Sequence, residues 1–216
     1  MTPDVQLPTP GAPRASALAS ARAAMLAEAA KPRGMGWRAR VGLVLALTVG
    51  AAAALAVGGM AAGFVSPDVL ASRWMTALPV TVAGILTVLA AWSPGRRGMR
   101  FAALFLAVGA AVTLVLGRTA SELAGSTPEW VCTVSHLAAA IPAGVVGLIG
   151  LRGMAPNRMR ALLAGLGVGT VGALLGELVC ARGPLHVGLY HLSAWAVVAA
   201  AIVVLASRLT SKSFAP

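Results

Sequence analysis

The chain has 216 residues, of which 58% are hydrophobic and 11% charged, and its mean hydropathy is +0.86. Soluble domains contain about 45–50% apolar and about 25% charged residues, so this composition argues against a soluble globular enzyme and against disorder over most of the chain. Basic residues outnumber acidic ones 17 to 6, for a net charge of +11, and their distribution along the chain indicates a membrane rather than a nucleic acid as the partner.

Residues 1–40 are expected to form a cytoplasmic tail rich in positive charge, and we expect no signal peptide there, because they contain no apolar core long enough for one. Four prolines within residues 1–13 indicate an extended lead, whereas the alanine-rich residues 14–31 contain neither Pro nor Gly and predict a helix. Leu18, Met25 and Ala29, with Ala21 between them, make a weak apolar stripe on this helix, and Arg22 lies between Leu18 and Met25. The helix either lies on the anionic membrane surface or docks a cytoplasmic partner through these residues.

Six stretches within residues 41–207 are apolar enough to cross a membrane, which takes about 17–25 residues. They predict an all-α membrane protein, a bundle of six transmembrane helices followed by a short cytoplasmic tail, residues 208–216. Glu177 is the one charged residue inside them. The stretches are Val41–Phe64, Thr76–Ser93, Phe101–Gly117, Cys132–Leu151, Ala161–Cys180 and His186–Ser207.

Positive charges alternate between the two sides of this bundle. Fourteen Lys and Arg residues fall in the two tails and in the connections at 94–100 and 152–160, against three in the intervening connections. The three are Arg73, Arg118 and Arg182. By the positive-inside rule, both termini are expected in the cytoplasm of a bacterial inner-membrane protein.

Motifs of soluble enzymes are missing from the sequence. It contains no P-loop, no GxSxG, no HExxH and no CxxC motif. The cytoplasmic connections, about 7 to 9 residues long, cannot fold alone. We therefore expect no enzyme, and we expect any chemistry to sit within the bundle or at its outer rim.

The two cysteines are expected to lie level at the outer surface. Cys132 opens the fourth span and Cys180 closes the fifth, so both are equally far from the turn near residue 156. The glycines of the fifth span share one helical face with Cys180, and a similar face of the fourth span carries Cys132 and His136. If these small faces meet, the sulfur atoms lie close together. The glycines are Gly165, Gly169, Gly172 and Gly176.

Three other polar residues share this outer layer. His136 is one turn from Cys132, Glu177 is nearly one turn from Cys180, and His191 enters the last span. A glutamate within the membrane is costly and marks a functional candidate, unless it is protonated or paired with His136 or His191. His186 alone is expected to be a solvated loop residue.

Three interpretations of the cysteine pair stay open. Cys132 and Cys180 are two small hydrophobic residues, a structural disulfide facing an oxidising compartment, or a redox- or metal-responsive site. The nearby histidines suit a soft metal such as zinc or copper, although the spacing is not that of a zinc finger.

Three segments of the C-terminal half resemble the NrsF-type membrane anti-sigma factors, which have six spans and about this length. The segments are EWVC at Glu129–Cys132, LVC at Leu178–Cys180 and YHLSAW at Tyr190–Trp195. The resemblance covers about residues 125–205, and the first half is similar in topology alone. CarR-like carotenogenesis regulators, six-span anti-sigma proteins that respond to light, are a related possibility.

This resemblance implies a protein that holds an extracytoplasmic-function (ECF) sigma factor at the inner membrane through its cytoplasmic tail. It also implies that Cys132 and Cys180 sense an envelope signal, such as a thiophilic metal, an oxidant or singlet oxygen, and that the bundle then releases the sigma factor. The partners are then the sigma factor and the bilayer, with no direct nucleic-acid contact.

Two other functions are weighed against this one. A small-molecule or ion transporter or channel is the main alternative, but it should show inverted repeats and polar groups near the midplane. A thiol oxidoreductase that uses a quinone should carry a reactive CxxC motif, which the chain lacks.

Overall fold

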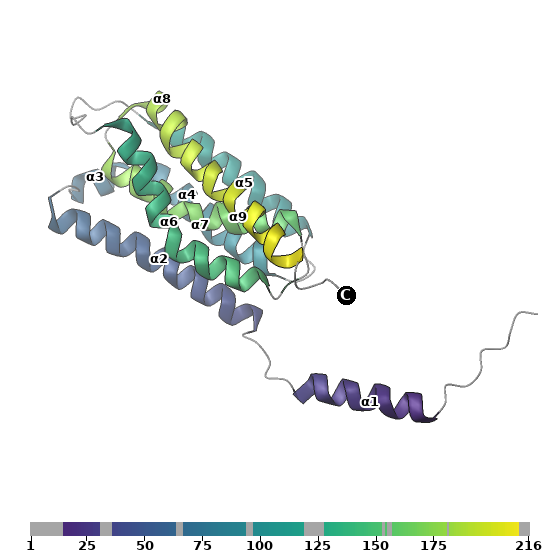
Figure 1. Ribbon diagram of the computed structural model, residues 1–216. Coiled ribbons are helices and arrows are strands. Elements are labelled where there is room, and N and C mark those ends of the chain that lie inside the picture. Colours follow the sequence, from purple (N-terminus) through teal and green to yellow (C-terminus); the bar gives the residue numbers. More distant parts are fainter. Residues whose placement is uncertain are drawn as a thin grey trace, which may run out of the picture. The chain divides into compact units, whose positions relative to one another are not determined.

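The computed structural model describes residues 15–30, 36–63, 67–93, 97–118, 128–152, 154, 157–180 and 182–211 (Figure 1). Within these residues the secondary structure is helical, with no strand. The helices are α1 (Ala15–Ala30), α2 (Trp37–Ala61), α3 (Pro67–Ser72), α4 (Trp74–Trp92), α5 (Arg97–Leu116), α6 (Glu129–Arg152), α7 (Arg158–Val179), α8 (Pro184–His186), the π-helix η1 (Val187–Leu192) and α9 (Ser193–Ser211).

The chain divides into two compact units, residues Met1–Gly36 and residues Trp37–Pro216. The first contains α1, which covers most of the segment expected to be helical; Arg14 and Lys31, the ends of that segment, lie outside the described residues. The second contains the bundle.

Six helices are long and apolar enough to cross a membrane, as the sequence predicts. The structure sets their ends differently, because several helices continue into the flanking charged residues. α5 begins at Arg97, four residues before the predicted start, and α6 extends from Glu129 to Arg152. Long arginine side chains can leave a helix end toward the polar boundary while their stems stay on apolar surface. The six spans in the structure are Trp37–Gly58, Trp74–Trp92, Arg97–Leu116, Glu129–Arg152, Arg158–Leu178 and Pro184–Leu209.

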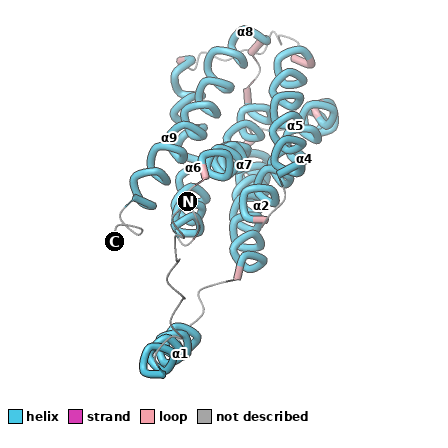
Figure 2. Tube along the Cα trace, turned by 90° about the vertical axis from the view of Figure 1, so that its right-hand side faces the viewer, coloured by secondary structure: helices cyan, strands magenta, loops and turns pink. Residues whose placement is uncertain are grey.

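Helix α7 is the core of the bundle, and Figure 2 shows it among the other helices. Among the 18 most apolar consecutive residues of α7, 72% are buried. In each of the other five spans the corresponding buried share is 44% or less. Small residues make this possible, because helices approach closely where no side chain intervenes. A Cβ atom at Gly165 would stand 2.6 Å from the Cα atom of Ala199 on α9, and one at Gly167 would stand 2.6 Å from Val88 on α4.

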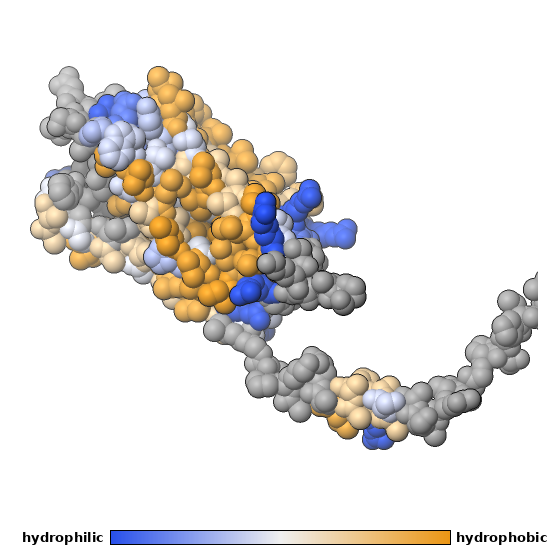
Figure 3. All heavy atoms as spheres, in the orientation of Figure 1, coloured by the Kyte–Doolittle hydropathy of each residue, from blue (hydrophilic) through white to orange (hydrophobic). Residues whose placement is uncertain are grey.

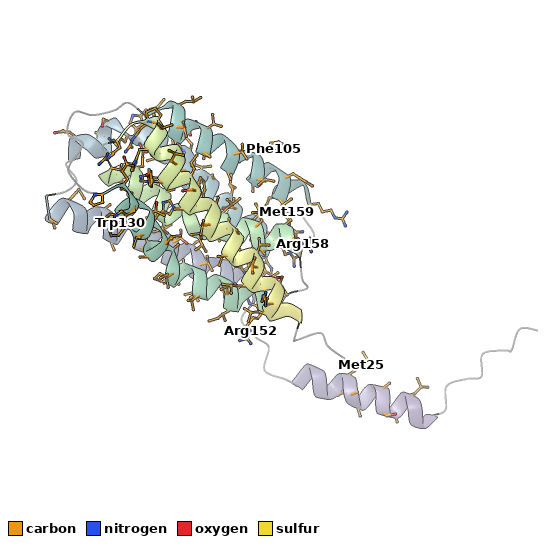
Figure 4. All side chains as sticks on the ribbon, turned by 45° about the horizontal axis from the view of Figure 1, so that its top comes forward. Met25, Phe105, Trp130, Arg152, Arg158 and Met159 are labelled. Carbon is orange, nitrogen blue, oxygen red and sulfur yellow. The ribbon has the colours of Figure 1, made fainter. Side chains whose placement is uncertain are left out.

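The outside of the bundle is apolar around its middle. Figure 3 shows hydrophobic residues over this part and hydrophilic residues gathered toward the two ends. Large side chains such as Phe105 and Leu116 on α5 are 75% and 79% exposed. In Figure 4, Trp130 lies toward one end of the bundle and Arg152 toward the other. An apolar belt between polar ends is the surface that a bilayer requires, so the chain is a multi-pass membrane protein by this criterion.

The last span departs from a regular α-helix at its start. Pro184 occupies the first turn of α8, where its missing N–H is harmless. The chain then follows the π-helix η1 for six residues before α9 begins at Ser193. π-Helical turns are rare and often accompany functional sites.

Candidate functional site

The two cysteines meet at one end of the bundle. Cys132 lies in the first turn of α6, and Cys180 caps the C-terminus of α7, where its N–H donates to the carbonyl of Gly176. Both are free thiols, and their sulfur atoms lie within 4.8 Å of each other. The proximity that the hairpin argument predicts is therefore present.

Two histidines complete a group around these sulfurs. The candidate ligand atoms of Cys132, Cys180, His186 and His191 all lie within 4.8 Å of one another, which is close enough to hold a metal ion. All are buried except Cys132, which is partly exposed. The expectation that His186 is a solvated loop residue is wrong, because α8 folds this residue into the bundle and leaves it 7% exposed.

His186 is the residue that sequence reasoning missed, and its backbone explains why. In an α-helix, residues five apart diverge by about 140° around the axis, so His186 and His191 would face different ways. A π-helix bonds residue i to residue i+5, and the ring centroids of these histidines lie 5.3 Å apart. The Gly183–Pro184 pair, a helix-start signal, was the available clue that the helix begins before His186.

His136 belongs to the same layer but not to the metal-sized group. Its Nε2 atom lies 3.1 Å from the carbonyl oxygen of Gly169. Its ring is 6.1 Å from that of His191, centroid to centroid. His136 is 1% exposed, so its side chain packs inside the bundle beside the cysteine–histidine group.

The glycines of α7 make space for these rings. A Cβ atom at Gly172 would overlap the ring of His136, and one at Gly176 would overlap the ring of His191. The two small faces therefore meet where His136 lies against Gly172 and the Gly169 carbonyl and where Cys132 lies near Cys180. Gly165 and Gly169 face Ala199 and Trp195 of α9 instead, because α9 also packs along α7.

Glu177 is paired with arginine rather than with His136 or His191. Its Oε2 atom is 2.8 Å from Nη1 of Arg118, and both side chains are buried. Thr76 donates a hydrogen bond of 2.6 Å to Oε1, and Nη1 of Arg73 lies 3.9 Å from the same atom. The alternative in which Glu177 pairs with a histidine is wrong, because the long side chains of arginines from two connections reach into this layer. Neither arginine was expected there.

The same arginines cap the C-terminal end of α7, whose last carbonyl groups lack helical partners. Arg73 donates to the carbonyl oxygens of Glu177 and Cys180, at 2.6 and 2.8 Å. Arg118 also donates to both and, at 2.9 Å, to that of Arg182. Burial lowers the pKa of Arg73, and the positive charge of Arg118 lowers it further. The segment that carries Cys180 is therefore held by two cations.

The expected partner-binding residues of the tail lie on α1. Leu18 and Met25 are 57% and 74% exposed, and Arg22 is exposed as well. Within its own unit, α1 thus presents apolar side chains to its surroundings.

Comparison with known proteins gives one strong relationship. The chain is 39% identical over 180 residues to the "Carotenogenesis protein CarR" of Myxococcus xanthus, a match that covers 83% of this chain and 81% of that protein. No protein-family model matches the chain. No solved structure matches it either.

Proposed function

Since this chain belongs to the family of the carotenogenesis protein CarR, we propose that it is an inner-membrane anti-sigma factor. It binds an ECF sigma factor in the cytoplasm and releases it when the outer end of the bundle receives an envelope signal. The observation that carries this proposal is the 39% identity to CarR over a multi-pass bundle. The resemblance of the C-terminal segments to NrsF-type anti-sigma factors supports it.

The tail supplies the binding surface in this proposal. Leu18, Arg22 and Met25 lie at i, i+4 and i+7, the spacing with which an amphipathic helix enters an apolar groove. The two apolar side chains are exposed on α1. The helix needs a partner to bury them.

The cysteine–histidine end of the bundle faces the periplasm in this proposal. Fourteen of the 17 basic residues then lie in segments on the cytoplasmic side. Cys132 and Cys180 form the sensor, with His136, Glu177 and His191 around them. The three basic residues left on the outer side include Arg73 and Arg118, which are engaged with the end of α7.

Release requires two states of the bundle with a sufficient energy difference. Changing the bound fraction from 99:1 to 1:99 takes about 5.5 kcal/mol of differential free energy. Binding a metal ion or forming a disulfide can supply this much, whereas a change in one exposed charge supplies about 0–1 kcal/mol. The signal therefore acts on the cysteine group itself.

The experiment is a pull-down of the tagged full-length protein from membranes of its own host, with bound proteins identified by mass spectrometry. Wild type should recover a small ECF sigma factor. Leu18→Glu and Met25→Glu should each reduce its recovery at least tenfold. Ala23→Glu, on the opposite face of α1, is the matched control and should retain it.

Two results would contradict the proposal. If wild type recovers no sigma factor, the anti-sigma assignment is wrong and the transporter alternative takes its place. If the sigma factor is recovered but its release by oxidant, metal or light is the same in Cys132→Ser plus Cys180→Ser as in wild type, the sensor is elsewhere.

A further inference from the structure

Four side chains from three membrane spans converge as a set of metal ligands. Cys132 comes from α6, Cys180 from the end of α7, and His186 and His191 from α8 and η1. A tetrahedral zinc site has Zn–S distances of about 2.3 Å and Zn–N distances of about 2.0–2.1 Å, so its ligand atoms are roughly 3.3–3.8 Å apart. The four atoms here lie within 4.8 Å of one another. The longest separation must shorten by about 1 Å, which side-chain rotation can achieve.

The histidine nitrogens lack other partners. Both ring nitrogens of His186 and the Nε2 atom of His191 are buried and accept or donate no hydrogen bond to the described residues. These side chains are 7% and 4% exposed. Burying a polar atom without a partner is costly, so the Nε2 atoms of the two rings call for a partner of another kind. A metal ion satisfies an imidazole nitrogen directly.

A carboxylate stands where a metal-bound histidine needs one. The Nδ1 atom of His186 is 4.0 Å from Oε1 of Glu129, so a shift of about 1 Å would bring them within hydrogen-bond distance and leave Nε2 for the metal. Histidine ligands usually donate their second ring N–H to a carboxylate or carbonyl, which fixes the ring. Arg182 is 3.1 Å from the same oxygen and holds the carboxylate in place.

The charges of the group suit a divalent cation. We infer that Cys132, Cys180, His186 and His191 bind one zinc ion in a closed, tetrahedral S2N2 site. On binding, the two thiols release their protons to solvent, and two thiolates with two neutral imidazoles balance the Zn²⁺ charge to zero. The neighbouring Arg118 and Arg182 are each paired with a carboxylate, Glu177 and Glu129.

Such a site would add a metal link among three spans that already touch at this end through the Glu129–Arg182 ion pair and the Thr133–Tyr190 hydrogen bond. The ion would link the start of α6, the end of α7 and the start of the last span. Zinc binding stands on this geometry alone, whereas its use as the sensed event rests on the proposed function. Loss of the ion, or thiol oxidation that ejects it, would then free three helix ends at once.

The test measures metal on the purified full-length protein in detergent under reducing conditions, without any sigma factor. Elemental mass spectrometry (inductively coupled plasma) should find one zinc ion per wild-type chain. Cobalt added to the metal-free protein should give the thiolate-to-cobalt charge-transfer absorption of a tetrahedral site. Cys180→Ser and His186→Ala should each weaken zinc binding at least tenfold.

His136→Asn is the matched control, because His136 is a buried histidine beside the group but outside it. It should retain the zinc and the cobalt spectrum, and circular dichroism should show that all variants keep their helices. The inference is overturned if reduced wild type takes up neither metal, if binding is equal in all variants, or if alkylation of the native membranes shows a Cys132–Cys180 disulfide. Since sigma-factor recovery is a separate measurement, the metal site and the anti-sigma function can fail independently.

Discussion

Arg118 and Glu177 form an ion pair with a 2.8 Å separation between Nη1 and Oε2, and their side chains are 2% and 3% exposed. The arginine follows α5, and the glutamate lies in the last turn of α7. Removing one partner of a buried pair leaves an uncompensated charge, which costs more than the pair itself contributes. The stability of this end of the bundle should therefore depend strongly on this ion pair.

We expect Glu177→Gln to lower the free energy of unfolding by about 3–5 kcal/mol, because Arg118 would stay buried without its counter-charge. Titration of the detergent-solubilised protein with sodium dodecyl sulfate measures this change. Glu129→Gln is the control, since Glu129 is 44% exposed in its pair with Arg182 and should cost about 0–1 kcal/mol. Equal effects of the two substitutions would contradict the role assigned to the buried pair.

Gly176→Ala should displace the ring of His191, because the added Cβ atom would overlap it. Overpacking of this kind costs about 1–3 kcal/mol. The variant should also bind cobalt more weakly than wild type, since His191 belongs to the ligand group. Gly188→Ala is matched to it, because a Cβ atom there meets nothing within 4 Å. The packing argument fails if Gly188→Ala is the more disruptive of the two in both measurements.

Trp195→Phe should remove one hydrogen bond from the interior of the bundle. Its Nε1–H donates to the carbonyl oxygen of Leu166 at 2.7 Å, and such a bond contributes about 0.5–1.5 kcal/mol. The carbonyl keeps a second donor in Thr170, so the loss should stay within this range. Trp130→Phe, whose ring is 61% exposed, should be nearly neutral by the same denaturation assay. A neutral Trp195→Phe would show that this bond adds nothing to stability.

The membrane orientation can be measured with reporter fusions. Alkaline phosphatase, which is active only in the periplasm, should be active when joined after Gly117 and inactive when joined after Arg152. A fluorescent protein at the C-terminus should fluoresce, because the positive charges predict a cytoplasmic tail. The reverse pattern would place the cysteine–histidine group on the cytoplasmic side and contradict periplasmic sensing.

Several features of this protein follow from local sequence. Apolar length identifies six membrane helices, because a bilayer imposes the same minimum length on each of them. The equal distance of Cys132 and Cys180 from one turn places them at the same level, since antiparallel helices rise at the same rate, and the small helix faces that carry them predict that the sulfurs approach. Both conclusions need only the lengths of the apolar stretches and the spacing of residues along the chain, and the structure agrees with them.

Tertiary structure alone decided the composition of the site. His186 reaches the cysteines because a π-helical turn rotates it toward His191, and no simple pattern in the sequence predicts that turn. Glu177 pairs with Arg118 because Arg118, two residues after the end of α5, lies beside the end of α7, a contact between residues far apart in the chain. Hydropathy determines which segments cross the bilayer. It does not determine how each helix is rotated about its axis or how far its long side chains extend. Those two quantities determine which polar groups meet.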